Sequence, residues 1–300
     1  MNTGTDLDLT LTRAPRLMPA LGKGVLTGIG KRPRPDAPLP AVRLTLPGVR
    51  ADPARTAAYA EVCGFAAHAP VLPVTYPHIL GFPLAARLMS ARAFPLPMLG
   101  LVHTTIEIVQ HAPLPADEPL DLTVYAAELR PHRRGTEAVM VTEARRDGEL
   151  LWEDHSTYLA RHRTEAPSAH PTPSPTAPSP AAPSPTAPLP PRAEWRLAGD
   201  LGRRHAAVSG DYNPIHLHPL TARPLGFPRA IAHGMWTFAR CAAEAVPEDA
   251  HAVRITSEFR APVLLPTTVT YAATGPTFEL RAGPPHEARL HLTGEAEIRS

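Results

Sequence analysis

A carboxylate and an imidazole lie five residues apart in the segment Ser209-Gly210-Asp211-Tyr212-Asn213-Pro214-Ile215-His216. On an α-helix this spacing would turn the two side chains about 140° apart, and in a strand it would separate them by roughly 16–18 Å. Asn213-Pro214 breaks both structures, because proline lacks an N–H and asparagine favours turns. We therefore expect a bent loop that unites Asp211 and His216. Such a pair could remove one proton and deliver another.

A second signal is His233-Gly234-Met235, where an apolar helical pattern begins 23 residues beyond Asp211. The free N–H groups at a helix start stabilise developing negative charge, and the helix dipole adds to this effect. Glycine suits such a place because it has no Cβ to keep a substrate away from the backbone. We predict that the two segments form one acid–base site with an anion-stabilising helix start.

The elements that must position these residues occur in two similar sets. In the first set we expect a strand at Val42, Leu44 and Leu46, a helix from Asp52-Pro53 through about Val62, and a buried apolar helix in which 77–84 leads into 85–91. Strands with two-residue periodicity follow from 101 to 161, with a turn at Arg146-Asp147-Gly148-Glu149.

The second set repeats this order. We expect a short helix over 201–208 and a second helix from near His233 to about Ala245. Strands are expected over about 253–261, 267–273, 277–281 and 287–299. A helix followed by four antiparallel strands, found twice, predicts an α+β fold made of two repeats.

A proline-rich segment separates the two sets. Eleven of the 28 residues from Thr164 to Pro191 are proline, which favours a semi-rigid polyproline II spacer. Residues 1–40 hold six further prolines and little periodicity. The predicted organisation is an extended N-terminal arm (1–40), a degenerate first domain (41–163), a linker (164–192) and a catalytic domain (193–300).

The motif at 209–216 resembles that of the MaoC-like dehydratases, the (R)-specific enoyl-CoA hydratase group. The resemblance continues through Ala232-His233-Gly234-Met235 and Phe259-Arg260-Ala261-Pro262-Val263. It implies a double hot-dog fold and reversible hydration of trans-2-enoyl thioesters, without metal or redox cofactor. Asp211 and His216 would be the catalytic pair and Gly234 the backbone donor to the thioester carbonyl. The residues expected to position the substrate are Asn213, Ser209 and His233.

The first half departs from this motif. It has Cys63-Gly64-Phe65-Ala66-Ala67-His68-Ala69-Pro70 at the corresponding place, without Asp or Asn, and Tyr76-Pro77-His78-Ile79-Leu80 at the second helix start, without glycine. We therefore predict one active site per chain. The first half would complete the fold and shape the acyl-chain cavity, with His68 and His78 in structural roles.

Other interpretations remain open at this point. Asp211, His216 and His218 could bind a metal, whereas Ser209 lacks the surroundings of a nucleophile and is expected to be a turn residue. His233 is expected to cap or brace its helix, and Met235, Trp236 and Phe238 belong either to the core or to an acyl pocket. The functional alternatives are a non-catalytic acyl-thioester-binding or scaffold protein, and a thioesterase of the same fold.

Composition limits the class of protein. A net charge of +2, from 30 basic and 28 acidic residues, gives no indication of nucleic-acid binding. Cys63 and Cys241 lack metal or disulfide spacing and are expected to be buried thiols. No apolar run reaches the ~20 residues that cross a bilayer, and no signal pattern is present, so we expect a cytoplasmic protein. The expected partner is an acyl-CoA or acyl-carrier-protein thioester, and a homodimer is possible.

Overall fold

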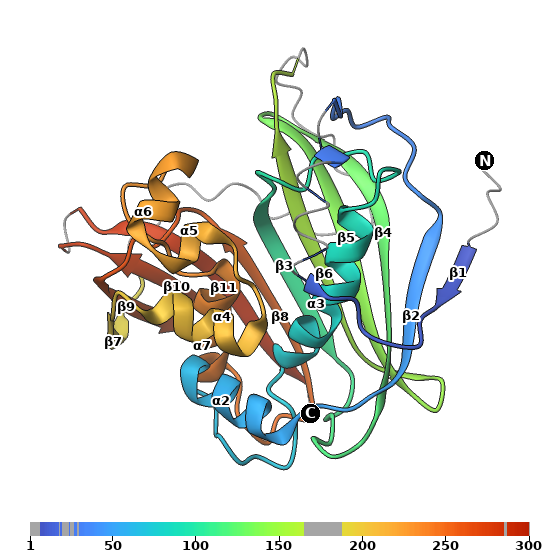
Figure 1. The fold of residues 1–300 in the computed structure, drawn as a ribbon. Helices are drawn as coiled ribbons and strands as arrows, with labels where there is room; N and C mark the ends of the chain where they lie inside the picture. Colours follow the sequence, from blue (N-terminus) through green and yellow to red (C-terminus); the bar gives the residue numbers. More distant parts are fainter. Residues whose placement is uncertain are drawn as a thin grey trace, which may run out of the picture.

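Among the described residues, eleven strands form one sheet in the order β1-β2-β4-β5-β6-β3-β8-β11-β10-β9-β7 (Figure 1). The structure is a computed structural model that describes residues 7–17, 19, 24, 27, 28, 30–164, 188–284 and 287–299. All described strand pairs are antiparallel except β1 with β2. The strands are β1 (Leu7–Thr10), β2 (Val42–Val49), β3 (Val102–Gln110), β4 (Leu120–His132), β5 (Gly135–Arg146), β6 (Glu149–Arg161), β7 (Pro191–Leu197), β8 (Ala252–Phe259), β9 (Thr267–Thr274), β10 (Thr277–Ala282) and β11 (Arg289–Arg299).

Each half of the sheet covers one main helix, which confirms the predicted α+β arrangement. Helix α3 (Tyr76–Met89) contacts β4 and β5, and helix α7 (Gly234–Ala245) contacts β8, β10 and β11. Helix α2 (Pro53–Cys63) crosses to the second half, where it packs against α4 (Leu201–Ser209) and α7 (Figure 1). Three short elements follow α4: α5 (Pro214–Leu217), α6 (Pro219–Ala222) and the 3₁₀ helix η1 (Arg223–Leu225).

The two halves meet where β3 pairs with β8. Main-chain pairing runs from Thr105 opposite Glu258 to Gln110 opposite Val253, so the sheet continues from one half to the other. Ile108 and Ile255 face each other at this junction, and neither side chain is exposed. Burying a side chain of this size contributes about 1.5–3 kcal/mol. One hydrophobic core therefore spans both halves.

Local sequence signals explain several element ends. The Asp52 side chain accepts a hydrogen bond of 2.8 Å from the Arg55 N–H, which caps α2 as predicted. Asp147 and Gly148 have φ values of 51° and 84°, the left-handed conformation that a tight hairpin turn requires. The expected apolar helix is confirmed as α3, which begins at Tyr76 and ends at Met89, two residues before the expected end. Pro77 fits the first turn, where an N–H has no partner in any case.

The predicted linker also needs correction. Residues 165–187 lie outside the described residues, but Pro191 already begins β7, so the last two linker residues belong to the sheet. Proline is tolerated there because it is the first residue of an edge strand. Cys63 and Cys241 are free and buried, as predicted. None of the described helices is long and apolar enough to cross a membrane.

Candidate active site

The segment after α4 bends back and brings the predicted pair together. Gly210 ends α4 in the left-handed conformation with φ 83°, and its N–H donates to the Ala206 carbonyl at 2.8 Å. Asp211, His216 and His233 then place one carboxylate oxygen and two ring nitrogens within 4.8 Å of one another. The expected bend is confirmed.

The bend is built differently from the expected loop, because His216 lies on the short helix α5. The Asn213 side chain accepts a hydrogen bond of 3.3 Å from the Ile215 N–H, and Pro214 occupies the first helical position. Asparagine and proline thus start a helix here instead of only breaking one. The helical turn directs His216 toward Asp211.

The His216 imidazole has a defined tautomer. Its Nδ1–H donates to the Ile231 carbonyl at 2.9 Å, and a carbonyl can only accept, so Nε2 keeps its lone pair. The ring is 7% exposed. Burial, followed by the neighbouring His233, lowers the pKa of His216 well below its ordinary value. His216 is therefore a neutral base at pH 7.

The Asp211 carboxylate is held from behind and keeps 28% of its side chain exposed. Its Oδ1 accepts from the Asn213 N–H at 3.1 Å, and its own N–H donates to Ser209 Oγ at 3.2 Å. The buried Ser209 hydroxyl donates in turn to the His205 carbonyl at 2.8 Å. Ser209 and Asn213 therefore contact the backbone around Asp211.

His233 connects the start of α7 to this loop. Its Nε2–H donates to the Asp211 carbonyl at 2.9 Å, while its ring stacks on His216 with centroids 3.7 Å apart. It makes no side-chain cap bond, so of the two expected roles the structure supports bracing. On its other side lies His205, 4.5 Å away between ring centroids and 1% exposed. Sequence reasoning missed His205, although its spacing of four from Leu201 places it on the buried face of α4.

Gly234 is the first residue of α7, so its N–H has no partner within the helix. A Cβ added there would lie 3.3 Å from the Phe259 ring, which leaves little room for a larger residue. Phe259 in turn contacts the His103 ring of the first half, with centroids 4.8 Å apart. His103 stacks on Tyr158 at 4.5 Å. The first half thus lies next to the helix start, and sequence reasoning did not identify His103 or Tyr158.

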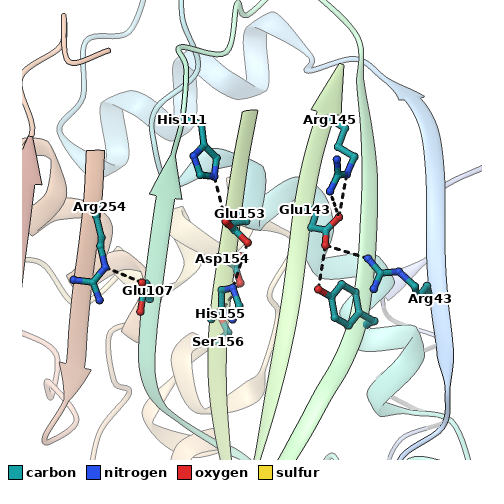
Figure 2. Close-up of polar contacts among 11 residues, drawn as sticks. Arg43, Glu107, His111, Glu143, Arg145, Glu153, Asp154, His155, Ser156 and Arg254 are labelled. Atoms are coloured by element: carbon teal, nitrogen blue, oxygen red, sulfur yellow. Dashed lines mark hydrogen bonds and ion pairs between the residues drawn. The ribbon is translucent and has the colours of Figure 1, made fainter. Parts of the chain in front are cut away.

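The two first-half histidines differ in their surroundings. His68 is exposed, whereas His78 is buried and its Nδ1 lies 2.8 Å from Asp154 Oδ2. Asp154 is not exposed, and its other oxygen accepts from Ser156 Oγ at 3.1 Å. Figure 2 shows Asp154 and Ser156 on β6, next to Glu153.

A metal bound by the expected set is not supported by the described residues. His218 is exposed and caps α6 through Nδ1, which accepts from the Leu220 N–H at 3.2 Å. His216 and His233 do lie near Asp211, but their ring planes are only 24° apart and stacked. An imidazole nitrogen binds an ion in the plane of its ring, so these two rings cannot both point at one ion.

The fold and this site define a two-repeat protein with an acid–base pair beside a helix start. Residues 182–275 match the family described as MaoC like domain. The chain is 38% identical over 244 residues to 3-hydroxyacyl-thioester dehydratase X of Mycobacterium tuberculosis, covering 81% of this chain and 84% of that protein. The chain belongs to the MaoC-like dehydratase family.

Solved structures agree with the double hot-dog fold. The crystal structure of HtdX of Mycobacterium tuberculosis matches with a TM-score of 0.70 and 32% identity, covering 86% of this chain and 100% of that one. A conserved hypothetical protein from Mycobacterium tuberculosis with a double hotdog fold matches with a TM-score of 0.50 and 14% identity. The match covers 89% of this chain and 96% of that one. The predicted double hot-dog fold is confirmed.

Proposed function

We propose that this protein is a hydro-lyase that reversibly hydrates trans-2-enoyl thioesters, of CoA or acyl carrier protein, to (3R)-3-hydroxyacyl thioesters. The observation that carries this proposal is the proximity of the partly exposed Asp211 carboxylate to the neutral His216, next to Gly234. The relative named 3-hydroxyacyl-thioester dehydratase X supports it.

The proposed hydration begins with a water held between Asp211 and His216. His216 Nε2 takes one proton as the water oxygen bonds to C3 of the enoyl group. The electrons of the double bond move toward the thioester oxygen, which accepts a hydrogen bond from the Gly234 N–H. The enolate then takes a proton at C2 from the protonated pair, and dehydration is the reverse of these steps. Positioned acid–base groups contribute roughly 10²–10⁴-fold in rate, and one oxyanion donor about 3–4 kcal/mol.

The remaining expected site residues would act through this pair. Asn213 starts the helix that carries His216, and Ser209 holds the Asp211 N–H. His233 fixes the Asp211 carbonyl relative to the start of α7. We propose positioning roles for all three. The reaction moves only protons and water, so we propose that it needs no metal or redox cofactor.

Loss of the conjugated enoyl-thioester absorbance with crotonyl-CoA tests the proposal. Chiral analysis of the product should give the (3R) alcohol, and a profile across longer chains would define the acyl preference. Release of free thiol without loss of the double bond would instead indicate a thioesterase. Binding without turnover of any chain length would indicate a non-catalytic protein.

A further inference from the structure

Three arginines surround a cavity at the N-terminal arm. Arg13 and Arg16 come from the arm and Arg87 from α3, and Ala14 and Pro15 complete the lining of a space of about 480 Å³. We propose that this cavity binds phosphate groups of the thioester carrier, which lie at the far end of its pantetheine arm. This inference rests on the function proposed above, because it assumes a thioester substrate.

The charges around the cavity favour an anion. All three arginines are exposed, and none takes part in the ion pairs found among the described residues. No carboxylate is among the described residues that line the space. Guanidinium groups bind phosphate through paired, charge-assisted hydrogen bonds, and several around one space match a group with more than one negative charge.

The arm connects this cavity to the catalytic loop. Leu17, which directly follows Arg16, lies over Gly210, where an added Cβ would be 2.9 Å from Leu17 Cδ1. Gly210 in turn precedes Asp211. Figure 1 shows the dark-blue arm running from β1 toward α3. The arm thus reaches this loop through Leu17, and its two arginines lie one and four residues before that contact.

Helix α3 gives the second connection. Arg87 lies nine residues after His78, which is roughly 14 Å along a helix axis. The His78 ring stacks on His103 at 6.1 Å, and His103 contacts Phe259, which packs against Gly234. Arg87 is thus near the opposite end of α3 from the aromatic side chains beside Gly234, and the phosphates of a thioester carrier are likewise held away from the thioester by the pantetheine arm.

Truncated substrates and charge-reversal variants test the assignment. Crotonyl-CoA, crotonyl-phosphopantetheine and crotonyl-pantetheine differ in their phosphates but share the reacting atoms. In Arg13→Glu, Arg16→Glu and Arg87→Glu, KM for crotonyl-CoA should rise about tenfold or more, with kcat retained, since one charged hydrogen bond contributes about one to two powers of ten. Turnover of crotonyl-pantetheine should not change. Arg289→Glu, an exposed arginine of β11, is the matched control.

Each outcome decides the assignment. If KM of the arginine variants rises for crotonyl-CoA alone, the cavity binds the nucleotide phosphates. If KM rises for crotonyl-phosphopantetheine as well, the cavity binds the phosphate next to pantetheine. Unchanged KM values in the arginine variants, or an equal rise in KM for crotonyl-pantetheine, would overturn the phosphate site. Calorimetry of CoA binding to the wild type and to the Arg87→Glu variant measures the affinity for CoA without turnover. If wild type hydrates none of the three thioesters, the proposed function itself has failed.

Discussion

Gly202→Ala is a demanding test of the site geometry, because it changes no group that takes part in the proposed chemistry. Gly202 lies in the first turn of α4, where the backbone of α5 crosses it. A Cβ added at Gly202 would be 1.9 Å from the His216 carbonyl oxygen and 2.8 Å from its carbonyl carbon. Both contacts are with backbone, so no side-chain rotation can relieve them.

The size of the effect follows from these distances. Real Cβ atoms stay at least 3.0 Å from such atoms, so α5 must move by about 1 Å relative to α4. A misplacement of about 1 Å at a catalytic group can cost roughly 10²-fold in rate. Overpacking of this kind costs about 1–3 kcal/mol of stability. We therefore expect a loss of about 100-fold in kcat in a protein that still folds.

The assay compares kcat for crotonyl-CoA hydration and urea unfolding in the variant and in Gly199→Ala. A Cβ at Gly199 meets only Pro266 Cδ, at 3.9 Å, so this control should keep wild-type activity. Wild-type kcat in Gly202→Ala would refute the argument that α4 sets the position of His216.

Three further predictions concern single side chains. Asp211→Asn should lower kcat by about 10²–10⁴-fold, while the free energy of unfolding changes by less than about 1 kcal/mol, because its side chain is partly exposed. Burial lowers the pKa of His205 well below its ordinary value, so the unfolded chain binds a proton that the folded chain does not. The contribution of the neutral His205 to the free energy of unfolding is therefore complete above about pH 6.5. It is lost as the pH falls toward the pKa of His205 in the folded protein. His205→Leu should flatten the fall in urea stability between about pH 7 and 5, and His68→Leu, at an exposed position, should not. Asp154→Ala leaves the buried His78 Nδ1 and the Ser156 hydroxyl without their hydrogen-bond partner and should cost about 1–3 kcal/mol of stability, against about 0–1 kcal/mol for the more exposed Glu153→Ala.

Contrary results are equally specific. Retained turnover in the Asp211 variant would remove this carboxylate from the proposed mechanism. An unchanged pH dependence after His205 substitution would mean that other groups cause the acid instability. Equal costs at Asp154 and Glu153 would show that the His78–Asp154 contact does not stabilise the fold.

Features that depend on a few neighbouring residues could be predicted from the sequence. The Asp52 cap, the turn at Asp147-Gly148 and four of the five strands of the second half, β8 to β11, follow from local propensity and two-residue alternation. The meeting of Asp211 and His216 was predictable for the same reason, since only five residues separate them.

Contacts between distant segments could not be predicted in this way. Alternation shows which face of a strand is buried but does not show which strand pairs with it, so the β3–β8 junction was not foreseen. The pair of His78 with Asp154, 76 residues apart, and the contact of Leu17 with Gly210 have no local signal. The first-half contribution to the site is therefore known only from the structure.

The β3–β8 junction also affects how the protein folds. It joins residues such as Thr105 and Glu258, which are 153 positions apart in the sequence. During synthesis β3 is complete long before β8 exists, and until then its edge has unpaired N–H and carbonyl groups that another strand could use. The β8 strand of a second copy presents the same pairing groups as the strand of the chain itself. Protein concentration during folding therefore determines whether a chain closes on itself or exchanges halves with a neighbour.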